Sequence, residues 1–316
     1  MDSADLAVFA AVARTGGINK AARALNTVQS NVTQRIRLLE DELGVPLFDR
    51  HSRGVTMTTA GAQLLPYAQR VGSLLAEARR AATNGPVPSG QLSIGSLETT
   101  TALRLPPILA AYATAYPQVD IQLQTGTAAS LIADVLEHRV EGAFVPGPVG
   151  HADLVETPIV EEELVLVTAP ASPSLERLAR AKTRDAKIIV FRAGCTYRRM
   201  LEELLAGHGI TEIRRLELGT LDGIIGCAAA GVGVTLLPRA VIEPARRAGR
   251  VAVHEIPPAS ARVPTLFVRR RDAFVSTALQ RFIECAQACS AAASLDASPR
   301  RNGVRAAPAR SAPASP

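Results

Sequence analysis

Apolar residues near the start of the chain recur at the three- and four-residue spacing of helices that bury one face. Leu6, Phe9 and Val12 form one such stripe, and it predicts a first helix that ends at residues 16–17. These two residues are glycines, for which left-handed backbone carries no penalty. A short second helix is predicted over residues 20–25, with Asn19 as its N-cap. The start of the chain is therefore expected to be a compact group of helices.

A third helix is predicted from an N-cap at Thr27 through Glu42, with a stop at Gly44. Its apolar residues fall on one face, and we expect all of them to be buried: Val28, Val32, Ile36, Leu39 and Leu43. The other face carries polar side chains that suit base edges and phosphates in a DNA major groove, namely Gln29, Ser30, Asn31, Thr33, Gln34, Arg35 and Arg37. Any amphipathic surface helix has a polar face, so the periodicity alone does not identify a DNA reader.

A longer helix is predicted over residues 59–83, with Thr58 as its cap. Its apolar residues alternate at spacings of four and three and form a seam that needs a partner helix: Leu64, Ala68, Val71, Leu75 and Ala78. No other predicted helix of this length lies near it in the chain, so we expect a homodimer across this linker helix. Pro66 has no amide hydrogen and is expected to bend the helix.

Residues 84–90 are rich in glycine and proline and predict a hinge. From there to about residue 291, strand and helix patterns alternate, which is typical of an α/β sheet. Beyond residue 291 the chain has almost no large apolar side chains, so we expect residues 292–316 to be disordered. Arginines in this tail could instead hold DNA phosphates, but a solvated extension is favoured.

Composition and charge exclude few classes of function. The net charge of +6 divides into +3 for residues 1–86, zero for residues 87–291 and +3 for the tail, so the basic character says little about the folded part. No stretch of about 18 apolar residues could cross a membrane. The acidic start of the chain is unlike a secretory signal, and a cytoplasmic location is expected.

Motifs for other functions are absent from the sequence. Four dispersed cysteines predict neither disulfides nor a metal site, and we expect no cofactor. Nucleophile-elbow, zinc-protease and phosphate-loop motifs are missing, which disfavours an α/β enzyme with catalytic residues. A transport binding protein would need a signal for export, and the acidic start of the chain disfavours this class as well. Three consecutive glutamates at residues 161–163 are interpreted as a solvated edge.

The first 61 residues resemble the LysR-type transcriptional regulators. The resemblance rests on Gly16-Gly17, Ala21-Ala22, Leu25, Gln29-Ser30, Val32-Thr33, Ile36, Leu39-Glu40, Leu43-Gly44, Leu47-Phe48, Arg50 and Thr58-x-Ala60-Gly61. It implies an all-α winged helix-turn-helix domain over residues 1–59, with wing strands at residues 48–50 and 55–57, and a linker helix over residues 60–86. Val28 and Asn31 depart from the common pattern, and Asn31 could add a DNA contact.

The resemblance also implies functional roles. Gln29, Ser30, Thr33 and Gln34 are assigned to the major groove, Arg35 and Arg37 to the groove or phosphates, and Arg50 and Arg53 to the DNA backbone beside the wing. Arg50 could instead pair with Glu40 or Asp49. The implied partners are double-stranded promoter DNA with near-palindromic sites, RNA polymerase, a second copy of the chain and, by further assembly, a tetramer.

Residues 90–291 resemble the effector-binding domain of the same family, an α/β two-lobed, periplasmic-binding-protein-like (type 2) fold. The marks are Leu105-Pro106, Tyr116-Pro117-Gln118-Val119, Gly231-Val232-Gly233 and Leu237-Pro238. Lobe I is expected over residues 90–161 and 267–291, and lobe II over residues 162–266. The chain is expected to cross between the lobes near residues 159–164 and 265–268, with a small-molecule effector bound in the cleft.

Two predicted helix starts carry polar side chains that face this cleft in our interpretation. We expect Glu98 to face an amine and Arg198 to grip a carboxylate, as an amino-acid-like effector requires. The other expected effector contacts are Ser96, Thr99, Thr100, Thr127, Phe144, Cys195 and Thr196. The hydroxyls could merely cap helices, and Glu98 could pair with Arg198. Cys195 is either an acidified thiol at a helix start or a small packed residue.

Overall fold

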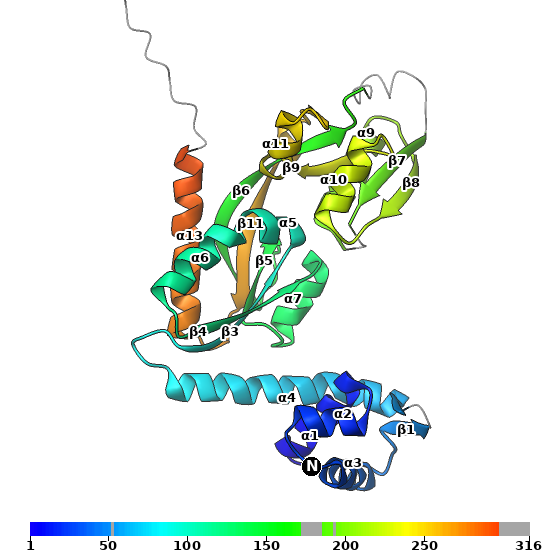
Figure 1. Cartoon of the computed structure of the whole chain (residues 1–316), viewed down its shortest axis with the longest axis vertical. Coiled ribbons are helices and arrows are strands. Elements are labelled where there is room, and N and C mark those ends of the chain that lie inside the picture. Colours follow the sequence, from blue (N-terminus) through cyan, green and yellow to red (C-terminus); the bar gives the residue numbers. More distant parts are fainter. Residues whose placement is uncertain (52–53, 172–184, 192–193, 297–316) are drawn as a thin grey trace, which may run out of the picture.

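The computed structural model describes residues 1–51, 54–171, 185–191 and 194–296 (Figure 1). A helical N-terminal domain packs on one side of the long helix α4, and the effector domain lies on the other side with its two lobes stacked away from that helix. The winged helix-turn-helix, linker helix and two-lobed α/β domain therefore follow one another as the sequence predicted.

Three helices and a hairpin form the N-terminal domain: α1 (Ser3–Thr15), α2 (Ile18–Ala24), α3 (Gln29–Leu43), β1 (Phe48–His51) and β2 (Gly54–Met57). Asp2 caps α1, and Gly16 ends it in left-handed backbone with φ of 67°. The core includes Phe9, whose ring centroid lies 5.3 Å from that of Phe48 in the wing. These contacts fix the wing and α3 on one small hydrophobic core.

Several local predictions in this domain were wrong. Asn19 lies inside α2, whose N-cap is Gly17, and α3 is preceded by Val28 rather than capped by Thr27. Val28 is 65% exposed and Leu43 is 38% exposed, so only the middle of the apolar stripe is buried. Both residues lie at helix ends, where the neighbouring helices no longer cover the stripe.

The wing is tied to the helices on both sides of it. The Glu40 carboxylate on α3 accepts hydrogen bonds from the amides of Leu47 and Phe48 at 2.8 and 3.2 Å. Thr58 donates from Oγ1 to the Pro46 carbonyl at 2.7 Å and caps α4 (Thr59–Thr83). A Cβ at Gly61 would lie 2.3 Å from the Leu47 carbonyl oxygen, so only glycine permits this approach. Backbone and side-chain hydrogen bonds thus hold α3 in a fixed position.

Helix α4 divides into two halves. Leu64, Ala68 and Val71 pack on the core of the N-terminal domain, so α1 of the same chain covers the first half of the predicted seam. The expectation that no helix of the same chain covers this seam was therefore wrong for its first half, and the homodimer across α4 stays a prediction. The helix continues through Pro66, and its exposed large apolar residues are Tyr67, Leu74 and Leu75.

Lobe I is built on three parallel strands, β3 (Gly90–Ser96), β4 (Val119–Thr125) and β5 (Gly142–Pro146). Its helices are α5 (Glu98–Leu103), α6 (Leu105–Ala115), α7 (Ala128–Leu136) and α13 (Thr277–Asp296). Helix α13 runs to Asp296, past the expected start of the tail at residue 292. The remaining tail residues, 297–316, lie outside the described part of the chain.

Lobe II contains β7 (Asp185–Val190), β8 (Glu212–Glu217), β9 (Thr235–Pro238) and β10 (Ala252–His254). The helices described in this lobe are α9 (Thr196–Gly207), α10 (Leu221–Ala229), α11 (Arg239–Arg247) and α12 (Pro258–Ala261). Sheet order in the largest sheet is β10-β6-β11-β5-β3-β4, with β9 also paired to β6. This sheet therefore runs from one lobe into the other.

Two long antiparallel strands, β6 (Leu154–Thr168) and β11 (Arg262–Arg270), join the lobes. Residues Leu164 onward in β6 pair with lobe II strands, which agrees with the first predicted crossing. The second crossing lies on β11, the strand that contains the predicted residues, but nearer its start, because Val263 packs in the core of lobe II whereas Thr265 to Val268 pair with β5 in lobe I. The pattern predicted a strand there, but strand partners are set by contacts distant in sequence.

Candidate functional site

The outward face of α3 carries a continuous row of polar side chains. Gln29, Ser30, Thr33, Gln34 and Arg37 line one shallow surface together with Leu38 and Asp41. These positions are four residues apart in two adjacent rows, which places them on one helix face. We call this surface the polar stripe of α3. No described side chain caps the first turn of α3, so its amide hydrogens are open to an anion.

Two residues predicted to contact DNA lie off this stripe. Asn31 donates from Nδ2 to Thr27 Oγ1 at 2.9 Å, across the start of the helix. Arg35 points back to α1, where its Nη1 lies 2.8 Å from Asp5 Oδ1. The prediction of a groove contact by Arg35 is therefore not supported, since the side chain joins two helices instead. Arg53 and the side chain of Arg50 lie outside the described part of the chain.

A cavity of about 450 Å³ lies between the lobes. It is formed by the starts of α5, α7 and α9 and by the ends of β4, β5, β7 and β8. Its lining residues are Leu97, Glu98, Thr99, Thr125, Gly126, Thr127, Ser130, Pro146, Phe191, Cys195, Thr196, Tyr197, Leu218 and Gly219. Hydroxyls and an apolar wall together suit a small organic molecule with a few polar groups.

The cavity contains five of the predicted effector residues, Glu98, Thr99, Thr127, Cys195 and Thr196. Three others do not line it. Ser96, Thr100 and Phe144 are buried, and the Phe144 ring packs edge to face on that of Phe267, with centroids 5.0 Å apart. Ser96 and Phe144 lie on strands, whose side chains alternate between the two faces of the sheet, and Thr100 lies on the buried face of α5.

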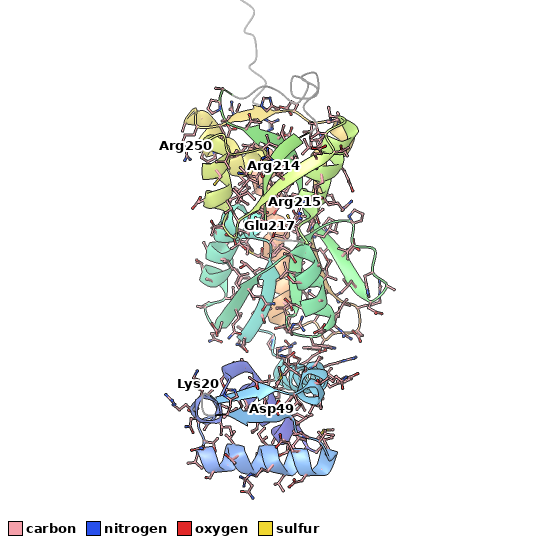
Figure 2. All side chains as sticks on the ribbon, turned by 90° about the vertical axis from the view of Figure 1, so that its right-hand side faces the viewer. Lys20, Asp49, Arg214, Arg215, Glu217 and Arg250 are labelled. Carbon is pink, nitrogen blue, oxygen red and sulfur yellow. The ribbon has the colours of Figure 1, made fainter. Side chains whose placement is uncertain are left out.

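Arg198 also lies outside the cavity, which corrects the prediction that it grips a carboxylate. Its Nη1 lies 2.6 Å from Glu217 Oε1, and its Nε lies 3.2 Å from Glu202 Oε1. Figure 2 shows Glu217 and the neighbouring Arg215 at the surface of lobe II. The four-residue spacing of Arg198 and Glu202 was a sequence signal for this helix-surface pair. The alternative pairing of Arg198 with Glu98 is not formed.

A buried ion pair supports the back of the cavity. Arg104, at the end of α5, donates two hydrogen bonds to Glu162 on β6, Nε to Oε1 and Nη2 to Oε2, both at 2.8 Å. Glu162 is only 4% exposed, so its interpretation as part of a solvated edge was wrong. Tyr197 lies beside this pair and forms a side-chain hydrogen bond with Thr99, and burial raises the pKa of Tyr197. Lobes I and II are thus joined directly behind the cavity.

Among the described residues that line the cavity, Glu98 has the one acidic side chain, and no lysine, arginine or histidine is present. Cys195 stands at the start of α9, but burial raises the pKa of its thiol against the weaker opposing effect of backbone hydrogen bonds. Burial therefore favours the interpretation of Cys195 as a small packed residue. The described residues contain no cluster of three or more metal-ligating side chains and no helix long and apolar enough to span a membrane.

Both domains match known families. The model described as "Bacterial regulatory helix-turn-helix protein, lysR family" matches residues 3–62, and the "LysR substrate binding domain" matches residues 86–290. The HTH-type transcriptional regulator GltR of Bacillus subtilis (strain 168) is 43% identical over 278 residues, which cover 88% of this chain and 93% of that protein. The HTH-type transcriptional regulator SoxR of Arthrobacter sp. (strain TE1826) is 38% identical over 284 residues, covering 90% and 96%.

Solved structures share the whole architecture. Full-length CbnR in complex with its target DNA is 25% identical, with a TM-score of 0.65 over 92% of this chain and 100% of that one. A full-length OxyR variant from Pseudomonas aeruginosa shows the same fold at 19% identity, with a TM-score of 0.65 over 92% and 94% of the two chains. The named relatives are transcriptional regulators and not enzymes. Because these matches span both domains, the chain belongs to the LysR family of DNA-binding transcriptional regulators.

Proposed function

We propose that this regulator binds near-palindromic promoter DNA as a homodimer and changes transcription when a small molecule occupies the cleft between the lobes. The observation that carries the proposal is the polar stripe of α3, which is held outward by the wing and by the core beneath it. A helix in this setting presents its outer side chains to the major groove. Such promoters lie in the cytoplasm of a bacterial cell, where we place the protein.

The stripe divides by chemistry into two kinds of DNA contact. Gln29, Ser30, Thr33 and Gln34 have the short or forked polar groups that read base edges, and Arg37 supplies a charge for phosphate or guanine. The solved complex of CbnR with its target DNA supports a DNA-binding role for the same domain in this chain. Arg50, Arg53 and Asn31 remain proposed contacts, with Asn31 limited by its hydrogen bond to Thr27.

The second half of α4 is the proposed dimer contact. Leu74 and Leu75 are 44% and 46% exposed there, beyond the part that α1 covers. Tyr67, in the first half of the helix, is 69% exposed. Two copies joined along α4 would present two α3 helices to half-sites about one DNA turn apart, roughly 34 Å. Further assembly into a tetramer and contact with RNA polymerase complete the proposal, and both rest on membership of the family.

The cleft suits an effector that bears an amine. Glu98 places a negative charge in a cavity whose volume lies within the range of about 300–1,000 Å³ that is usual for small-molecule sites. Thr127 and Thr196, at the starts of α7 and α9, offer hydroxyls and nearby helix amides to an acidic or polar group of the same molecule. An amino-acid-like effector remains the proposal, with these groups in place of Arg198.

Gel retardation tests the DNA-binding proposal. We expect the protein to retard a fragment that spans the intergenic region beside its own gene, and to do so in excess random DNA. Leu75→Glu is expected to weaken this binding by shifting the dimer toward monomer, which sedimentation would measure. Arg79→Gln, an exposed change on the same helix, is the control. Equal retardation of intergenic and random fragments would contradict the proposal.

Thermal shift with a panel of ligands tests the effector class. We expect amino acids or other amine-bearing acids to raise the melting temperature of the wild type, with an affinity reduced about 10- to 100-fold in Glu98→Gln. Arg198→Gln is the matched control, because its side chain lies outside the cavity, and it should bind as the wild type does. Stabilisation by simple acids and not by amine-bearing ones would overturn the amine assignment.

A further inference from the structure

A second polar cluster lies where α4 meets the effector domain, far from the polar stripe. Glu77 and Arg80 come from α4, His138 follows α7, Glu141 precedes β5, and Arg270 ends β11. These five residues surround one small internal space, together with the backbone near Phe274. We call this cluster the linker joint. At this joint, lobe I of the effector domain contacts α4, the helix on which the DNA-binding domain packs (Figure 1).

Hydrogen bonds and ion pairs hold the joint together. Glu77 accepts a hydrogen bond at Oε1 from the amide of Phe274 at 2.6 Å, and its Oε2 lies 3.5 Å from His138 Nδ1. Arg80 Nε lies 3.4 Å from Glu141 Oε2. At the end of α4, Asn84 accepts from the Thr277 amide at 2.8 Å. The segment predicted to be a free hinge is therefore attached to the effector domain on both of its sides.

Several polar atoms of the joint are buried without a hydrogen bond. They are Arg80 Nε, His138 Nε2 and Glu141 Oε2. His138 also has a φ of 60°, a left-handed conformation that is unfavourable for a residue with a Cβ. Burial lowers the pKa of His138 and raises that of Glu141, so both side chains resist charging in this place. Opening the joint costs little free energy, because water then forms hydrogen bonds with the polar atoms that are buried without a partner.

One short helix connects the cleft to the joint. Thr127 and Ser130 at the start of α7 line the effector cavity, and His138 stands just beyond its other end. Nine residues of helix span about 13 Å. Arg270 donates from Nη1 to the Leu136 carbonyl at 2.9 Å and so ties the end of α7 to β11. Because Leu131 and Val135 are fully buried, α7 is packed as a rigid body between the two places.

We propose that α7 transmits occupancy of the cleft to α4: a ligand that moves the start of α7 shifts His138 against Glu77 and changes the angle of the linker helix. The step rests on the proposed role of the cleft as the effector site. The contacts of the joint itself are made by residues of this chain alone. It sets how firmly the end of α4 is held, and thereby how far apart two DNA-binding domains sit in a dimer.

Hydrogen–deuterium exchange on the full-length protein tests the joint without any effector. His138→Gly keeps the left-handed backbone and removes the side chain, and we expect amides of residues 74–84 to exchange about 10-fold faster than in the wild type. His138→Asn, which also tolerates this backbone, gives a second variant. Arg79→Gln on the exposed side of α4 is the control and should not change exchange. Unchanged exchange in both His138 variants would overturn the proposal.

Transmission through α7 is tested by a double-mutant cycle. Thr127→Ala removes the cap at the cleft end of α7, and we expect it alone to speed exchange in residues 74–84. In a protein that already carries His138→Gly, Thr127→Ala should change the exchange rate of these residues little, because α7 no longer contacts α4 through His138. Independent, multiplicative effects of the two changes, or no effect of Thr127→Ala on α4, would overturn the role of α7. Gel retardation of intergenic DNA by the same variants separates this result from failure of the proposed function.

Discussion

The two functional regions of this regulator are made in opposite ways. One helix supplies the whole polar stripe of α3, whereas the cleft takes its lining from both lobes, with residues as far apart in sequence as Leu97 and Gly219. A helix repeats its faces every three to four residues, so its function is visible in local spacing. A cleft between lobes depends on tertiary contacts, and single residues in it cannot be identified from spacing alone.

The DNA-binding domain and the effector domain also differ in how exposed their ion pairs are. Arg35 and Asp5 in the DNA-binding domain are 35% and 17% exposed in their side chains, whereas Arg104 and Glu162 are 19% and 6% exposed. Water screens the first pair and leaves the second to interact in a low-dielectric interior. In the DNA-binding domain, this ion pair between α1 and α3 is therefore open to water, whereas the Arg104–Glu162 pair of the effector domain is enclosed at the junction of the lobes.

The largest expected effect compares these two pairs. Arg104→Ala leaves Glu162 buried without a partner and should cost the effector domain about 3–5 kcal/mol in free energy of unfolding. Arg35→Ala should cost the DNA-binding domain at most about 1 kcal/mol. Differential scanning calorimetry would measure both. Arg262→Ala, which breaks the neighbouring exposed pair with Glu161, is the control, and an equal loss in that variant would contradict the distinction.

A second comparison separates the residues of the polar stripe. Gln29→Ala should weaken binding to the specific promoter site by about 1–3 kcal/mol and leave random DNA almost unchanged. Arg37→Ala should weaken both alike and lower the salt dependence of binding by about one counterion, if its contact is to phosphate. Fluorescence anisotropy at several salt concentrations distinguishes the two patterns. Equal losses on both DNAs from Gln29→Ala would remove its base-reading role.

Local patterns predicted the helices of the N-terminal part and some of their ends, although the caps expected at Asn19 and Thr27 were wrong. The cap at Thr58 and the glycine end of α1 are where the sequence placed them, since each depends on a few adjacent residues. Errors occur where tertiary contacts decide the outcome. The apolar seam of α4 resembles a dimer contact, yet α1 of the same chain covers Ala68, because helical periodicity does not say which helix packs against it.

In the cleft, the polar residues at helix starts were identified, but their neighbours were not. Glu98 and Thr196 line the cavity, as predicted from the strand–turn–helix pattern. Tyr197 was missed because it follows Thr196 within a helix and is recognisable only by its contact with lobe I. Glu162 was missed for a related reason, since its position in a run of three acids suggested a surface, and Arg104 lies 58 residues away.

The pH dependence of the linker joint gives a smaller effect. Burial lowers the pKa of His138 below its unfolded value near 6.5, so the native contact is fully stable above that pH and loses stability as the pH falls through it. The charged groups that face His138 are Glu77, Arg70 and Arg80 from α4, Glu141, Arg270 and Asp272.

The raised pKa of Glu141 acts in the opposite direction, because burial favours its protonated form in the folded joint, so the His138 contribution is isolated by difference. We expect exchange in residues 74–84 of the wild type to accelerate between pH 7 and pH 5.5, after correction for the intrinsic pH dependence of exchange. His138→Gly should show a flatter profile over this interval. Parallel profiles of the two proteins would show that protonation of His138 has no effect on the joint.

The smallest effect concerns Cys195, where the start of α9 and burial act in opposite directions on one thiol. The helix field and the amides of Tyr197 and Arg198 favour the thiolate, but burial dominates and raises the pKa. Iodoacetamide should therefore modify Cys195 more slowly at neutral pH than it modifies a free cysteine, with a rate that rises as the solution becomes more alkaline. Peptide mass spectrometry follows the site, and Cys195→Ser removes the signal. Faster modification than free cysteine at neutral pH would mean that the helix start, and not burial, controls this end of the cleft.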